Sequence, residues 1–91
     1  MMMAVMLYVA VFVQGYGEEK YYFGGTSFVN YHNCERFYQE YQDNIVPGII
    51  NFATQEFGTE DLSITEIGCV TRQVDYKGNA TMTNERPIIK K

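Results

Sequence analysis

Thirteen consecutive apolar residues, Met1–Val13, restrict what this chain can fold into. A helix that crosses a bilayer needs about 20 such residues, whereas this run stops at Gln14 and charged residues follow at positions 18–20. We therefore expect no membrane span. The run is rich in valine and contains Tyr8 and Phe12, and these residue types favour β-strands. A strand that is apolar on both faces is typical of the centre of a sheet.

A second interpretation of the same run is a secretory signal. Its length suits the apolar segment of a signal peptide, and Val13-Gln14-Gly15 resembles a cleavage region, although no Lys or Arg precedes the run. In this alternative residues 1–15 are removed, and the remainder is an exported, disulfide-stapled binding domain that is secreted or periplasmic. The two interpretations differ in whether the apolar run belongs to the core.

The composition indicates a single globular domain. A chain of 91 residues has the length of one domain, and 46% hydrophobic against 20% charged residues argues against disorder. Residues 1–71 carry nine acidic and two basic side chains, a balance of −7, whereas residues 72–91 carry five basic and two acidic ones, a balance of +3. The acidic part would repel phosphate, so we do not expect nucleic acid as the main partner.

The segment after the first strand predicts a short strand, an extended stretch and a long helix. Lys20–Phe23 is a strand by composition, which Gly24-Gly25 closes tightly, and residues 26–29 form a third short strand or an extended approach to the helix. Asn33 is a suitable N-cap and Gly58 a suitable stop. The apolar or aromatic positions between them recur at helical spacing and define one face: Cys34, Phe37, Tyr38, Tyr41, Ile45, Ile49, Phe52 and Ala53.

Pro47 lies inside this helical pattern. Proline removes one backbone hydrogen bond and kinks or breaks a helix, but the apolar spacing continues across it, so we predict one bent helix or two abutting ones. The next strand is Leu62–Arg72, in which Gly68 suggests a bulge or the close approach of another backbone. Residues 75–91 are a basic tail or a weak terminal hairpin that follows a domain of residues 1–74.

These elements define an α+β fold, with an antiparallel sheet of three to four strands packed against one long, Pro-kinked helix in β-β-α-β order. The first and last strands are expected side by side, so Cys34 in the helix and Cys69 in the last strand could meet. A disulfide there would stabilise the fold by about 3–4 kcal/mol; the alternative is two buried free thiols in a reducing cytosol. Two cysteines and His32 are too few for a zinc site, and we predict no cofactor.

His32, Cys34 and Glu35 are the cluster that most resembles a reactive site. A cysteine at a helix N-terminus has a stabilised thiolate, and a neighbouring histidine can act as its base, so a thiol-dependent enzyme is one hypothesis. The alternative is a structural cysteine that follows an exposed histidine. The glycines do not form a nucleotide-binding motif, and we expect a non-enzymatic protein.

The eight tyrosines and six phenylalanines are more than so small a core can bury completely. Exposed tyrosines are suited to protein interfaces. We therefore predict a protein partner or self-association, with the contact made by four tyrosines and the two terminal lysines: Tyr16, Tyr21, Tyr22, Tyr31, Lys90 and Lys91.

The chain resembles the short proteins encoded in marine bacteriophage genomes, especially those of cyanobacterial phages. The resemblance covers about residues 3–72 and rests on the apolar first strand, the aromatic stretch before Gly24-Gly25, the Asn33-Cys34-Glu35 helix start and the returning Gly68-Cys69-Val70. It implies a small, stable accessory or interaction domain without catalytic activity. Such a protein would be a virion accessory piece or a modulator of a host protein in the infected cytoplasm.

Overall fold

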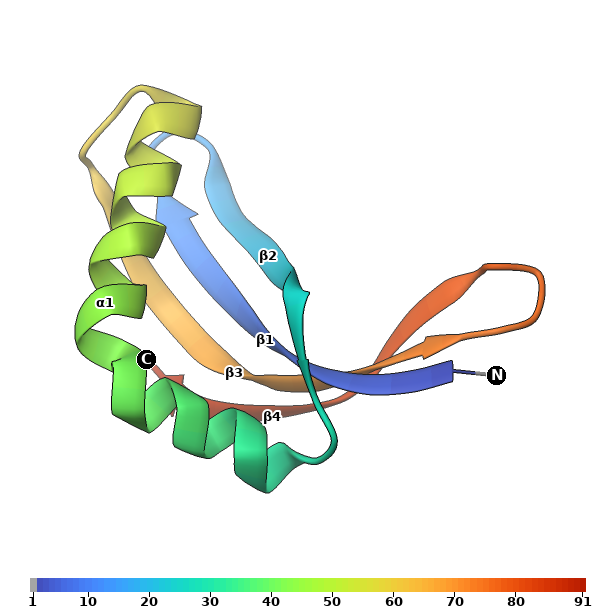
Figure 1. Ribbon diagram of the computed structural model, residues 1–91. Helices are drawn as coiled ribbons and strands as arrows, with labels where there is room; N and C mark the ends of the chain where they lie inside the picture. The colour runs from blue at the N-terminus through green and yellow to red at the C-terminus, as the bar shows by residue number, and fades with distance from the viewer. Residues whose placement is uncertain (1) are drawn as a thin grey trace.

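A computed structural model describes residues 2–91, which form four strands and one helix. Their order is β1 (Met2–Val13), β2 (Gly17–Phe28), α1 (Tyr31–Phe57), β3 (Leu62–Val74) and β4 (Ala80–Lys90), as Figure 1 shows. The strands form one antiparallel sheet in the spatial order β2-β1-β3-β4, and α1 packs on one face of it. This confirms the α+β class, but the chain order is β-β-α-β-β, one strand longer than predicted.

β1 is the central strand that the apolar run predicted, since it pairs with β2 on one side and with β3 on the other. Five of its alternate side chains point to the helix and form the main core: Val5, Leu7, Val9, Val11 and Val13. A chain cleaved after residue 15 would lose this strand and the pairing of both neighbours. The exported alternative, in which residues 1–15 are removed, therefore requires a different sheet and stays a prediction.

Long polar side chains cover the second apolar face of β1. Tyr8 is fully buried there, with the Lys20 ammonium 5.4 Å from its ring centroid and the Lys20–Glu85 ion pair of 3.0 Å close by. The Tyr8 hydroxyl donates a hydrogen bond to Glu66. Burial, followed by the Glu66 carboxylate, raises the pKa of Tyr8 well above its ordinary value. Cross-strand polar groups thus surround Tyr8, while Met82 packs against this smaller cluster, which also contains Met6 and Val70.

Gly24-Gly25 does not end a strand as predicted, because β2 runs through both glycines. The register slips at this point: Val5 pairs with Phe28 and Leu7 pairs with Phe23, so four residues of β2 stand opposite one of β1. An excess of residues in one strand bends that strand locally. The glycine pair therefore marks a bend of the edge strand rather than a hairpin turn.

The helix begins earlier than predicted and ends where predicted. Asn30, not Asn33, is the N-cap: its backbone is extended, and its side chain accepts a hydrogen bond from the Asn33 amide at 2.8 Å. Gly58 has the left-handed φ of 67° that glycine adopts without a steric cost, and its amide donates to the Thr54 carbonyl at 2.9 Å. α1 is continuous across Pro47. This helix is not apolar enough along any long stretch to cross a membrane.

Residues 75–91 were predicted to be a basic tail or a weak terminal hairpin. They contain β4, which pairs with β3. The Asp75 carboxylate holds the connecting turn, because it accepts hydrogen bonds from the Lys77 and Asn79 amides at 2.8 and 2.9 Å. The expected boundary at residue 74 therefore falls inside one sheet. This hairpin and the start of β1 extend beyond the helix-covered part of the molecule (Figure 1), and we call residues 2–4 and 72–82 the arm.

Gly68 confirms the close backbone approach predicted for it. A Cβ atom at this position would lie 2.8 Å from the Cα of Pro87 and 2.8 Å from the Tyr8 ring. The register between β3 and β4 also shifts at Gly68. Only glycine therefore fits between β4 and the ring of Tyr8 without a displacement of the backbone.

Candidate functional site

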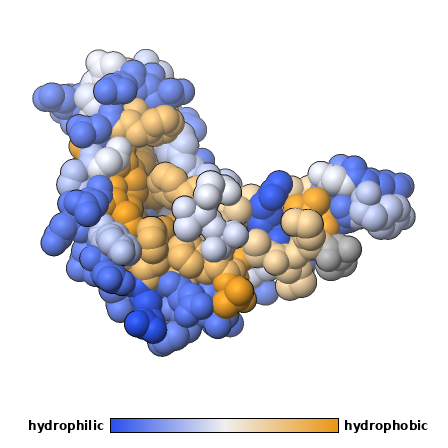
Figure 2. Space-filling model, viewed as in Figure 1, coloured by the Kyte–Doolittle hydropathy of each residue, from blue (hydrophilic) through white to orange (hydrophobic). Residues whose placement is uncertain are grey.

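An apolar groove of about 480 Å³ lies between α1 and the half of the sheet made by β1 and β2. Leu7 and Val9 line it from the sheet, Phe23 from the edge strand, and Ile45 and Phe52 from the helix. Figure 2 shows this surface as a hydrophobic hollow between hydrophilic rims. Its volume falls within the range of about 300–1,000 Å³ that is typical of ligand pockets.

The groove exists because α1 sits over β3 and β1 more than over β2. The Cys34–Cys69 disulfide joins the N-terminal part of α1 to β3, and the inner face of β2 reaches the helix through aromatic rings. The Phe28 and Phe37 ring centroids lie 5.2 Å apart, and those of Tyr21 and Phe52 lie 5.3 Å apart. These two ring pairs link β2 to α1, and all four rings belong to residues that line the groove.

Gly48 keeps the helix side of the groove open. It borders the groove and stands one helical turn from Ile45 and from Phe52, which line the same side. A Cβ atom built on Gly48 meets no atom of the described residues within 4 Å. A larger residue here would project into the space that the groove now provides.

The Tyr21 end of the groove is acidic. Burial, and then the carboxylates of Glu56 and Glu19, raise the pKa of the Tyr21 hydroxyl above its ordinary value. Among residues 2–91, no lysine or arginine lines the groove; Arg36 lies beyond Phe37, beside Glu40 in a separate shallow depression. The groove therefore suits a neutral or positively charged apolar group better than an anion.

The six residues predicted for an interface do not form one surface. Tyr21 and Tyr22 border the groove, while Tyr16 lies at the turn after β1, its ring 5.1 Å from that of Phe57. Lys90 approaches Glu66 at 3.9 Å, and the Lys91 amide donates to the carbonyl of Thr65. Whether these residues contact a partner stays a prediction.

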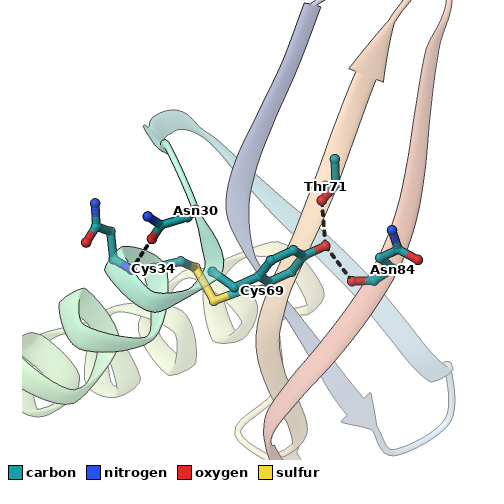
Figure 3. The surroundings of a disulfide bond; sticks show 7 residues. Asn30, Cys34, Cys69, Thr71 and Asn84 are labelled. Carbon is teal, nitrogen blue, oxygen red and sulfur yellow. Dashed lines mark hydrogen bonds between the residues drawn. A yellow bond between two sulfur atoms is a disulfide. The ribbon is translucent and has the colours of Figure 1, made fainter.

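Tyr31 has a structural environment. Its hydroxyl hydrogen-bonds with Thr71 and donates to the Asn84 carbonyl at 2.7 Å (Figure 3), and the Arg86 guanidinium lies 4.2 Å from its ring centroid. It therefore anchors the start of α1 to β3 and β4.

The cysteines lie at the same helix–sheet junction (Figure 3). Cys34 and Cys69 form a disulfide between α1 and β3, with their Cα atoms 6.3 Å apart, and both residues are fully buried. The expected contact across the helix–sheet interface is thus present. A cysteine in a disulfide has no thiolate to attack a substrate, and His32 is exposed beside it. The geometry therefore gives the thiol-enzyme hypothesis no support.

Sequence reasoning missed the groove, although one signal pointed to it. The apolar stripe of the helix includes Phe37, Ile45 and Phe52, and the packing predicted for it places all three against the sheet. The small residue Gly48 falls in line with Ile45 and Phe52, where a core-facing helix would carry a large side chain. No protein-family model, curated protein or solved structure matches the chain, so the site rests on its geometry.

Proposed function

We propose that this chain is a non-enzymatic interaction protein that acts by protein–protein contact, with the groove between α1 and β2 as its contact surface. One observation carries this proposal: an apolar space of about 480 Å³ opens to solvent and is bordered by half-exposed aromatic rings. Apolar surface of this kind on a small protein is typical of an interaction site. Apolar side chains of a partner would fill the groove.

The neighbouring edge strand supports a protein as the occupant. β2 lies at the edge of the sheet, and residues 21–28 contain no charged residue and no proline. Such an edge can accept the backbone of an extended partner segment, whose alternate side chains then point into the groove. Most natural edge strands carry a charge, a proline or a cover that prevents this pairing.

We infer that Pro47 shapes the groove by bending the helix. Proline cannot donate a hydrogen bond to the carbonyl of Asp43 four residues before it, and this loss commonly kinks a helix. In Figure 1 α1 follows a curved path along the sheet. Ile45 precedes Pro47 and Phe52 follows it, and both border the groove.

We propose a virion as the setting, in line with the resemblance to bacteriophage proteins. Disulfides persist in oxidising surroundings, which include virion surfaces and the periplasm. In a reducing host cytoplasm, a modulator of a host protein would have to retain this bond through its full burial. A disulfide that stays intact in protein isolated from its source supports the oxidising setting.

The test is a selection from a library of random short peptides for binding to the immobilised Tyr76→Ala variant. Tyr76 lies in the arm and does not line the groove, so the groove is unchanged in this variant. We expect enrichment of peptides that carry aromatic or aliphatic anchors and no acidic residues. Their binding should be lost in Gly48→Phe, which fills the groove, and retained in Gly48→Ala, which does not. The proposal would be overturned if both Gly48 variants bound the peptides equally, or if no peptide were enriched. A small apolar molecule that copurifies in the groove would overturn it as well.

A further inference from the structure

The arm is a protrusion that carries exposed apolar side chains. Met2 and Met3 are 71% and 62% exposed, and Tyr76 at the tip is 90% exposed. Figure 2 shows the arm extending away from the hollow between the helix and the sheet. Contiguous exposed apolar residues are costly in water and mark contact surfaces.

The tip of the arm presents an aromatic ring together with a positive charge. The Lys77 ammonium lies 5.9 Å from the Tyr76 ring centroid. The turn beneath it is ordered by Asp75, whose carboxylate accepts two backbone amides and the Asn79 side chain. These hydrogen bonds, above all the one from the Asn79 backbone amide, lower the pKa of Asp75. An ordered tip loses little conformational entropy when it binds.

The groove has the complementary properties. It accepts apolar groups, aromatic rings border it, and Glu19 and Glu56 lie close enough to its Tyr21 end to raise the pKa of that hydroxyl. The arm itself is basic, since residues 72–82 carry Arg72 and Lys77 against Asp75, a balance of +1. Opposite charges guide two surfaces together and fix their orientation.

We propose that the partner is a second copy of this chain, and that Tyr76 of one copy enters the groove of the next while Lys77 approaches Glu19 and Glu56. This inference rests on the proposed function of the groove and names its occupant. The arm cannot reach the groove of its own copy, because β3 and β4 continue into the arm as paired strands that extend away from α1. The contact joins two different surfaces, so copies associate head to tail into a ring or an open chain.

The test is sedimentation velocity on the wild-type protein and two single variants over a wide range of concentration. Wild type should associate, whereas Tyr76→Ala, without the tip, and Gly48→Phe, without the groove, should each weaken association at least about tenfold, a loss of about 1.4 kcal/mol. A mixture of the two variants retains one intact tip and one intact groove. It should therefore form a heterodimer and nothing larger.

Two controls separate a specific contact from general stickiness. Val29→Ala removes a side chain that is 85% exposed outside the arm and the groove, and Gly48→Ala leaves the groove open; both should associate as wild type does. A wild-type protein that stays monomeric, a mixture that stays monomeric, or a Val29→Ala variant that behaves as Tyr76→Ala would each overturn the inference. The peptide selection uses Tyr76→Ala, so the groove can still prove to be a docking site if self-association fails.

Discussion

Gly48→Ala is expected to stabilise the protein, although Gly48 borders the proposed binding site. Glycine inside a helix costs about 1 kcal/mol relative to alanine, because it loses more backbone freedom on folding. The new methyl group meets open space, since no atom of the described residues lies within 4 Å of its position. We therefore expect a gain of about 1 kcal/mol in the free energy of unfolding, and about 4–8 °C in the melting temperature.

The assay is urea unfolding followed by circular dichroism, with Gly58→Ala as the matched control. Gly58 has a φ of 67°, which alanine adopts only with strain, so the same substitution should lower stability by about 1 kcal/mol at that position. Opposite signs at the two glycines are the expected result. A loss of stability in Gly48→Ala would mean that the space beside the helix is filled, and the groove would then not exist as described.

Three further substitutions test the fold. Replacing Cys34 and Cys69 together with alanine should cost about 4 kcal/mol by urea unfolding, from chain entropy at a separation of 35 residues; a cost below about 1 kcal/mol would mean that the bond does not constrain the unfolded chain. Gly68→Ala should cost about 1–3 kcal/mol, because its methyl group would meet backbone 2.8 Å away, and a neutral result would contradict that approach. Burial and Glu66 raise the pKa of Tyr8 in the folded state, so its contribution to stability is complete below about pH 10 and is lost as the pH rises through the folded-state pKa. Tyr8→Phe should flatten this alkaline loss in unfolding measurements, and an unchanged pH profile would contradict the cause assigned here.

The sequence predicted the elements that follow from periodicity and missed those that depend on distance between elements. A continuous apolar run has one stable place in a small sheet, and β1 occupies it. Asn30 and Asn33 are equally good caps by residue type, and the choice between them follows from the extended backbone at Asn30. β4 was ambiguous because it contains charges and Pro87, which an edge strand tolerates since one side of its backbone pairs with no strand.

The groove was missed for a related reason. Helical spacing indicates which side chains face a sheet, but not how far the helix lies from each strand. α1 is drawn toward β3 by the disulfide and by the bonds of Tyr31. Phe52 of the predicted apolar face is consequently 52% exposed, and it borders an open space instead of completing the core.

The most direct test of the groove as the docking site for a second copy of the chain is an amide chemical-shift titration. Isotope-labelled Tyr76→Ala, which retains only the groove, is titrated with unlabelled Gly48→Phe, which retains only the tip. We expect the shifts to be confined to amides that border the groove, such as those of Phe23, Thr26 and Gly48, and to leave the opposite face around Lys20 and Glu85 unchanged. Shifts centred on that opposite face, or no shifts at the groove, would contradict the docking of a second copy in the groove.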